Sequence, residues 1–284
     1  MVRIGTVWDS ALDAVRGRAG ILLPIAALGL FAPGVVQAAL GSYLAPQPGA
    51  APAAGTAALT GLVSIAVLLL TTWGALAVTG VTSHPDTTAG EAGGQAARRL
   101  LPLVGVYLVL GLAVFALLIP LGVLLVLAGV DVRGFAAPGY RPQVNGAPAL
   151  LVVLYLLALV GLFFWAFARL LPIVPVVLHE RLGLGAIGRA FRMTRGLGAK
   201  LVGLLLLYAV VATVASLAVT SVVGLVFRLV LGNDNAATAA FLGGVAGAAV
   251  GAALGVLSYT FVARLYAALS GRDLRAVFED EPAR

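Results

Sequence analysis

The sequence has no cysteine and few charged residues. None of its 284 residues is Cys, and Asp, Glu, Lys and Arg together make up 10% of the chain. Without cysteine, a disulfide framework and thiolate chemistry are excluded, and the soft ligands of many metal sites are missing. Soluble domains carry about 25% charged residues. The low charge content therefore argues against an ordinary water-soluble domain.

Groups that commonly perform chemistry inside a membrane are also missing. No Asp, Glu or Lys lies in the middle of an apolar stretch, although proton-coupled transporters and intramembrane enzymes usually depend on such groups. The sequence contains no glycine-rich phosphate loop, Ser–His–Asp order or His-Glu-x-x-His helix. His84 and His179 are its only histidines, and a metal site needs three or more converging ligands. We expect no catalytic residue, no metal and no cofactor.

What the sequence does contain is long apolar stretches, and 61% of its residues are hydrophobic. About 20 consecutive apolar residues cross a hydrocarbon core of roughly 30 Å as a helix. The polar connections are too short to form a separate globular domain. We predict an all-α polytopic membrane protein in which residues 1–284 form a single transmembrane domain. Its six predicted spans cover residues 21–44, 57–82, 100–130, 148–178, 201–231 and 236–270.

Prolines interrupt the third and fourth stretches. A proline removes one backbone hydrogen bond and clashes with the preceding turn of a helix. We therefore expect Pro120 to break or kink the third span, and Pro172 and Pro175 to end the fourth. This leaves residues 170–178 as an apolar segment near the membrane interface, with the side chain of Arg169 reaching to water.

The basic residues are distributed unevenly between the two ends of the predicted bundle. An even number of spans places both termini on one side, and 13 of the 18 Lys and Arg residues flank span ends on that side. The positive-inside rule then predicts cytoplasmic termini. The net charge of +7 does not indicate a nucleic-acid partner, because the cations flank span ends and form no water-facing basic surface.

An internal repeat precedes the first and fifth spans. Residues 5–17 align with residues 184–196, and residues 87–99 form a weaker third copy before the third span. Each copy has apolar residues at helical spacing on one face and charges elsewhere. We predict three units, each a cytoplasmic interfacial helix followed by a membrane hairpin. In the first two copies Trp8, Ala11, Leu12 and Arg16 fall opposite Ile187, Ala190, Phe191 and Arg195.

The second copy of this repeat is strongly basic. Its candidate headgroup-contacting residues are Arg189, Arg192, Arg195 and Lys200. Basic residues near an anionic membrane surface gain about 1 kcal/mol each, so one interpretation is contact with lipid headgroups or a phosphate-bearing ligand. The alternative is an ordinary topological anchor with a solvated charged face.

Small residues at a strict four-residue spacing mark the last span. Such a glycine zipper forms a flat ridge where the backbone of another helix can approach closely. We expect this ridge to pack within the six-helix bundle. Self-association and a permeation path are the two alternatives. The residues are Ala239, Gly243, Gly247, Gly251 and Gly255.

Two adjacent segments carry a resemblance to a known family. Residues 172–180 (PIVPVVLHE) and 185–196 (GAIGRAFRMTRG) resemble the membrane domain fused to some bacterial glycerophosphodiester phosphodiesterases, and that domain's stand-alone relatives. The opening segment and residues 265–270 (LYAALS) fit the same pattern. The resemblance implies a bacterial inner-membrane location. The family's catalytic barrel and its metal-binding carboxylates are absent here, so no catalytic residue is carried over.

These observations favour a non-catalytic inner-membrane protein. We expect an accessory, scaffold or lipid-contacting subunit of a membrane complex or envelope process, with membrane lipids and other membrane protein subunits as partners. The alternative is a transporter or channel for a small or lipidic solute. That alternative predicts a water-lined cavity between the spans that contains Gln37, Thr71, Thr72 and Ser216.

Overall fold

The computed structural model describes residues 4–44, 54–83, 86–131 and 147–271, and every regular element in these ranges is a helix. Six helical stretches are long and apolar enough to cross a membrane, which confirms the predicted all-α polytopic membrane fold. They are Ala19–Tyr43, Gly55–Ser83, Ala89–Leu127, Pro148–His179, Gly198–Leu231 and Asn233–Leu269.

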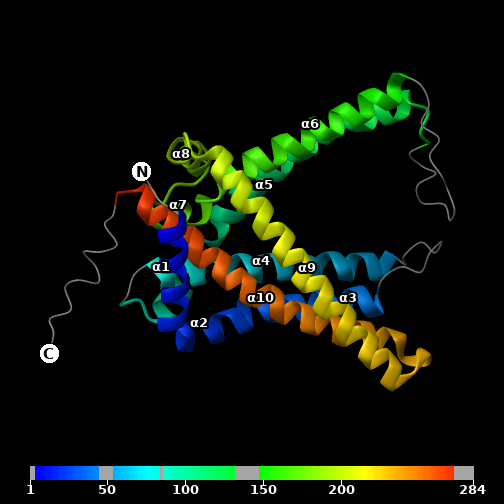
Figure 1. The fold of residues 1–284 in the computed structure, drawn as a ribbon, viewed down its shortest axis with the longest axis horizontal. Helices are drawn as coiled ribbons and strands as arrows, with labels where there is room; N and C mark the ends of the chain where they lie inside the picture. The colour runs from blue at the N-terminus through cyan, green and yellow to red at the C-terminus, as the bar shows by residue number, and fades with distance from the viewer. Residues whose placement is uncertain (1–3, 45–53, 84–85, 132–146, 272–284) are drawn as a thin grey trace.

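The spans are built from individual helices that Figure 1 labels in chain order. The first span combines α2, a π-helical turn and α3, and the fourth combines α6 with the short α7. The elements are α1 (Ile4–Gly17), α2 (Ala19–Ala26), η1 (Ala27–Phe31), α3 (Ala32–Tyr43), α4 (Ala54–Ser83), α5 (Ala89–Leu127), α6 (Ala147–Leu170), α7 (Ile173–His179), α8 (Gly185–Met193), α9 (Gly198–Leu231), η3 (Asn233–Asn235) and α10 (Ala236–Leu269).

The two proline predictions have different outcomes. Of the break or kink predicted at Pro120, the break is wrong, because α5 continues through it to Leu127. In the same turn the Tyr155 hydroxyl of α6 donates to the Leu117 carbonyl at 2.6 Å, and a neighbouring helix can satisfy backbone groups near a proline in this way. The fourth span does break, since α6 ends at Leu170 and Pro172 precedes α7.

The segment after this break is buried in the core of the bundle, and its place near the membrane interface stays a prediction. All six residues Ile173–Leu178 of α7 are buried. Pro175 lies within α7, in its first turn, and does not end a helix. The helix packs against α4, α5 and α8. Its apolar side chains therefore complete the core at the end of the bundle that carries the termini (Figure 1).

Two of the three repeat copies are separate helices at this end of the bundle. α1 lies across the ends of the spans (Figure 1), and two of its buried residues, Val7 and Ala11, correspond in the repeat to Ala186 and Ala190, the buried residues of α8. The third copy is different, because it forms the first turns of α5 itself. A capping box begins that helix, in which the Thr88 hydroxyl accepts from the Glu91 amide and the Thr88 amide donates to the Glu91 carboxylate.

The bundle is packed more tightly at the end of the termini than at the far end. α10 is central and packs against α9, α3, α1 and α4. Near the termini, Leu76, Leu103 and Val176 are fully buried in one core. Toward the far end, every residue of α5 from Gly111 to Pro120 is exposed. The α5–α6 hairpin therefore diverges from the other helices (Figure 1).

Candidate lipid-contacting and helix-packing sites

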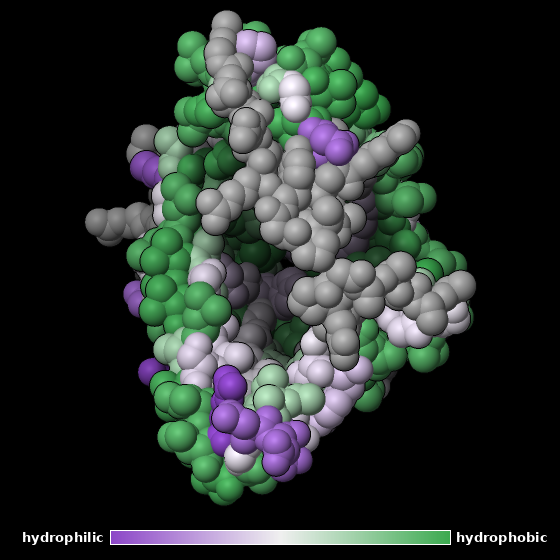
Figure 2. Space-filling view, turned by 90° about the vertical axis from the view of Figure 1, so that its right-hand side faces the viewer, coloured by the Kyte–Doolittle hydropathy of each residue, from purple (hydrophilic) through white to green (hydrophobic). Residues whose placement is uncertain are grey.

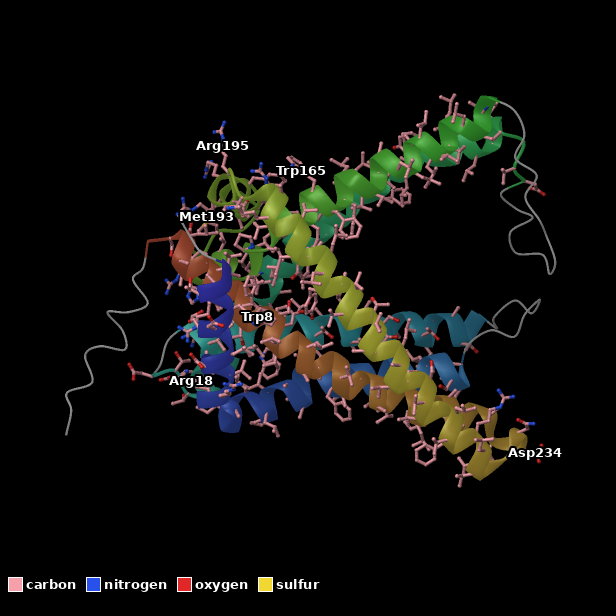
Figure 3. The ribbon with its side chains drawn as sticks, viewed as in Figure 1. Trp8, Arg18, Trp165, Met193, Arg195 and Asp234 are labelled. Atoms are coloured by element: carbon pink, nitrogen blue, oxygen red, sulfur yellow. The ribbon has the colours of Figure 1, made fainter. Side chains whose placement is uncertain are left out.

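The basic residues of α8 and the start of α9 do not all have the same environment. Arg192, Arg195 and Lys200 are exposed, and the side chain of Arg195 points away from the bundle (Figure 3). Arg189 is different, because its Nε donates to both carboxylate oxygens of Glu180, at 2.9 and 3.1 Å. Three of the four predicted headgroup-contacting residues are therefore free of an intramolecular acid among the described residues, and Arg189 is engaged.

Arg169 joins the end of α6 to α8. The sequence predicts a side chain that reaches to water, whereas in the structure the side chain packs against α8. It is half-buried, its Nη1 donates to the Phe191 carbonyl at 3.3 Å, and its guanidinium carbon lies 5.3 Å from the centre of the Trp165 ring. A cation over an aromatic face is attracted by the quadrupole of the ring. Gly198 provides the space for this arrangement, because a β-carbon there would lie 3.3 Å from the Arg169 Nε.

A polar network joins four helices at the same end of the bundle. The Tyr266 hydroxyl of α10 donates to Glu180 at 3.1 Å. The Tyr266 ring also stacks on the ring of His179, the last residue of α7, with 5.8 Å between ring centres. His179 Nε2 lies 2.9 Å from the Ser83 hydroxyl at the end of α4. Through Glu180 the network continues to Arg189 of α8.

Ser83 and His179 resemble the nucleophile–base pair of a hydrolase, but the hydrogen-bond directions differ. The Ser83 hydroxyl lies 2.6 Å from the Thr79 carbonyl, which can only accept. When the single hydroxyl proton is directed to Thr79, the donor to Ser83 is His179 in the tautomer that carries its proton on Nε2. A nucleophilic serine needs the opposite direction, in which the imidazole accepts the hydroxyl proton. This geometry is that of a structural hydrogen bond between α4 and α7.

No candidate metal centre occurs in the part of the chain that the structure describes. There, no group of three or more His, Asp or Glu side chains converges. His84 lies outside the described residues, and His179 contacts the Ser83 hydroxyl and the Tyr266 ring.

Part of the glycine ridge of α10 faces α9. A β-carbon on Gly243 would lie 2.6 Å from the Thr220 carbonyl oxygen and 3.0 Å from the Gly224 Cα. On Gly247, a β-carbon would collide with the Thr220 hydroxyl. These glycines therefore allow a close approach of two helix backbones, and Ala239 is also buried.

The other end of the ridge departs from the prediction. Gly251 is exposed and has open space at its β-position, whereas Gly255 faces Leu30 of the first span. An α-helix turns about 100° per residue, so positions four apart drift by about 40° per step. From Gly243 to Gly255 the drift is about 120°. A strict four-residue spacing consequently cannot keep all its members against one neighbouring helix.

A second small-residue face of α10 was not recognised from the sequence. A β-carbon on Gly244 would lie 2.7 Å from the Ala38 Cβ of α3, and one on Gly34 would lie 2.7 Å from the Ala248 Cβ of α10. The signal is present as two small pairs at a spacing of four, one on each helix, which is a recurrent pattern at close helix crossings. α10 is therefore held closely on two sides.

Another close contact joins the first and second spans. A β-carbon on Gly74 of α4 would lie 2.7 Å from the Gly29 Cα in η1. Here the helix widens by one residue, because the Ala32 amide bonds to the Ala27 carbonyl five residues back. Such single-turn π-bulges are rare within α-helices. The sequence contains both glycines but no pattern that links them across 45 positions.

Two arginines near the termini are more buried than a role as simple topological charges would require. Arg264 of α10 is 6% exposed and experiences the like charge of Arg18. Arg18, at the junction of α1 and α2, donates to the Val81 carbonyl of α4. The sequence could have indicated their burial, because both arginines lie beside or inside apolar runs. Both side chains are part of the packing where α1, α4 and α10 meet.

The structure does not bring together the polar residues expected of a transport cavity. Thr72 is buried and donates to the Leu68 carbonyl of its own helix at 2.7 Å. Ser216 lies on the side of α9 that faces Gly247. Gln37 is exposed on α3, and Thr71 is half-buried on α4. α10 packs between α3 and α9, so it separates Gln37 from Ser216.

Comparisons of the chain with protein-family models, curated proteins and solved structures find no match. The resemblance carried by residues 172–180 and 185–196 therefore stays a prediction. These residues form α7, α8 and the turn after α8, which build the end of the bundle described above.

Proposed function

We propose that this protein is a non-catalytic inner-membrane protein of bacteria that acts as a lipid-contacting accessory or scaffold subunit. It would be a stand-alone relative of the membrane domain found in some glycerophosphodiester phosphodiesterases. The observation that supports this most is the exposed basic surface formed by Arg192, Arg195 and Lys200 beside the tightly packed end of the bundle. Such a surface attracts anionic lipid headgroups.

The orientation in this proposal is cytoplasmic for the end that carries α1, α8 and the termini. Support comes from the distribution of charge, since most of the Lys and Arg residues belong to connections at this end. Asp234 lies at the opposite end of the bundle from Arg18 and Arg195 (Figure 3). In this orientation the basic surface faces the anionic inner leaflet.

The non-catalytic part of the proposal is supported by how the polar groups are used. Ser83 bonds to His179 and Tyr266 bonds to Glu180, and these two bonds connect α4 and α10 to the end of α7. The transporter alternative has less support, because Gln37 and Ser216 lie on different sides of α10.

The test replaces Arg192, Arg195 and Lys200 with Gln and measures the anionic phospholipid retained after gentle detergent extraction. The reference variant replaces Arg16, Arg98 and Arg99 with Gln, which removes the same charge at other positions of this end. Since one basic contact corresponds to about 1 kcal/mol, or roughly fivefold in affinity, we expect the first variant to lose at least about fivefold more anionic lipid. Equal retention by both variants would contradict the lipid-contacting role. Proteins that copurify with the wild type would identify the complex.

A further inference from the structure

The main core ends in a layer of half-buried side chains from four elements. On α5 this layer ends at Leu110, and the next ten residues of the helix are all exposed. The layer therefore forms the floor of the space between the α5–α6 hairpin and the other helices. Seen from the far end, the molecule is hollowed at its centre, with apolar side chains at the rim and paler, less hydrophobic ones inside (Figure 2). The residues of the layer are Leu30 of η1, Trp73 of α4, Tyr107 and Leu110 of α5, and Tyr259 of α10.

Two tyrosines of this layer approach each other from different helices. Tyr107 and Tyr259 lie close enough to interact electrostatically. α5 packs against α4, α6 and α7, whereas α10 packs against α9, α3, α1 and α4, so the two phenols approach across the space between α5 and α10. Leu30 borders the same space, because a β-carbon on Gly255 would lie 3.3 Å from Leu30 Cδ1 and 3.9 Å from Tyr259 Cε2.

The hydroxyls of these two tyrosines are available to a ligand. Neither has a hydrogen-bond partner among the described residues. Tyr208 of α9 is different, because its hydroxyl donates to the Leu254 carbonyl of α10 at 3.1 Å. Tyrosine hydroxyls in apolar surroundings usually find a partner, since an unsatisfied polar group there is costly. The layer therefore offers two O–H donors inside an apolar recess.

The depth and charge of this layer favour a neutral ligand. Tyr259 and Trp73 each lie ten residues before the last residue of their helix, which is about 15 Å along the helix axis. α4 and η1 contain no charged residue, and α5 contains none after Arg99. The charged residue of α10, Arg264, lies five positions closer to the helix end. A charged headgroup is costly at such a depth in a membrane.

We propose that the recess binds a neutral glyceride, such as a diacylglycerol, whose ester carbonyl oxygens accept from the Tyr107 and Tyr259 hydroxyls. Two donors at the floor match a ligand that carries two neighbouring acceptor oxygens. The acyl chains then cover Leu30, Leu110 and the exposed apolar residues of α5 beyond them. The inference goes beyond the proposed function and uses none of the residues of the basic surface.

The experiment uses the purified full chain in phosphatidylcholine nanodiscs and the fluorescence of Trp73, which brominated acyl chains quench on contact. Trp73 becomes the only tryptophan after Trp8→Phe and Trp165→Phe, and its indole N–H is bonded to the Gly93 carbonyl at 3.1 Å. Three probes carry equal bromine at equal mole fraction, namely a diacylglycerol, an alkane without oxygen, and a phosphatidylcholine. We expect the diacylglycerol to quench Trp73 with an apparent affinity about fivefold or more above the other two probes.

Three further changes locate the oxygen contacts. Tyr107→Phe and Tyr259→Phe each remove a hydroxyl and keep the ring, and neither removes a bond within the described fold, so both variants should remain folded. Each should reduce the preference for the diacylglycerol over the alkane, and the double variant should abolish it. Tyr208→Phe is the matched control, because its hydroxyl already bonds to Leu254, and the preference should remain.

Equal quenching of Trp73 by the diacylglycerol and the alkane would overturn the site. Equal quenching by the diacylglycerol and the phosphatidylcholine would also overturn it, since the recess would then hold ordinary bilayer lipid only. A preference that persists in the double variant would contradict the role of the two hydroxyls. None of these results affects the extraction experiment, which measures anionic lipid at Arg192, Arg195 and Lys200.

Discussion

The Tyr266 hydroxyl donates to Glu180 Oε1 at 3.1 Å, although the two residues are 86 positions apart in the chain. Glu180 also accepts the Arg189 Nε at 2.9 Å. One carboxylate therefore joins the end of the central helix α10 to the basic helix α8. The bundle consequently fixes the position of α8.

The first prediction tests this connection through Tyr266→Phe, which removes the hydroxyl and keeps the buried ring. Net contributions of single hydrogen bonds are about 1 kcal/mol, and about 1.5–3 kcal/mol when one partner is charged. We expect a loss of about 1–2 kcal/mol in stability against thermal or denaturant unfolding in detergent. Tyr43→Phe is the matched control, because its hydroxyl is exposed and lies 3.4 Å from Thr238. Equal stability of the two variants would show that the Glu180 contact contributes little.

The second prediction separates two glycines of the same ridge. Gly243→Ala places a methyl group against the backbone of α9. Overpacking of this kind typically destabilises a protein by about 1–3 kcal/mol. Gly251→Ala meets open space and gains up to about 1 kcal/mol of helix propensity. Thermal stability in detergent should therefore fall for the first variant and stay equal or rise for the second. The opposite order would mean that the α9–α10 contact is wrongly placed.

The third prediction concerns the contact between the first two spans. Gly74→Ala introduces a β-carbon at 2.7 Å from the Gly29 Cα, and neither backbone can rotate away as a side chain could. We expect reduced expression of folded protein and a loss of about 1–3 kcal/mol in stability. Gly61→Ala on the same helix is the control, since nothing lies within 4 Å of its β-position. Similar yields of folded protein from both variants would argue against the close approach.

The fourth prediction uses a buried hydroxyl. Thr260 of α10 is fully buried, and its hydroxyl has no hydrogen-bond partner among the described residues. Thr260→Val keeps the shape and removes an unsatisfied polar group whose burial costs about 1–3 kcal/mol. We expect this variant to be as stable as wild type or more stable. Thr79→Val is the comparison, because the Thr79 hydroxyl donates to the Ala75 carbonyl at 2.7 Å and its loss should destabilise slightly. Marked destabilisation by Thr260→Val would indicate a polar partner for that hydroxyl.

The number and type of spans could be predicted because apolar length is a local property of the sequence. The end of α6 before Pro172 was also predictable, because the effect of a proline on its own helix is local. The continuation of α5 through Pro120 was not, since it coincides with a contact from Tyr155, 35 residues away. Local rules describe what a proline does to its own helix and do not describe what a neighbouring helix supplies.

The candidate sites show the same difference between features that the local sequence predicts and contacts that depend on neighbouring helices. A spacing of four identified the glycines of α10, but the rotation of the helix directs Gly243 to α9 and Gly255 to Leu30. The basic residues of α8 were visible as charges, whereas the pairing of Arg189 with Glu180 depends on how α7 leads into α8. The Ser83–His179 contact joins residues 96 positions apart. Only the tertiary arrangement of the helices determines these pairs.

The most direct test of the central claim, a lipid-contacting α8 on the cytoplasmic side, uses the absence of cysteine in the natural chain. Arg195→Cys and Asp234→Cys place single thiols on exposed residues at opposite ends of the bundle. A membrane-impermeant maleimide is applied to cells whose outer membrane is permeabilised and whose inner membrane is intact. We expect labelling of Asp234→Cys, and labelling of Arg195→Cys only after the inner membrane is opened. Labelling of Arg195→Cys with the inner membrane intact would contradict the orientation and, with it, contact of α8 with the cytoplasmic leaflet.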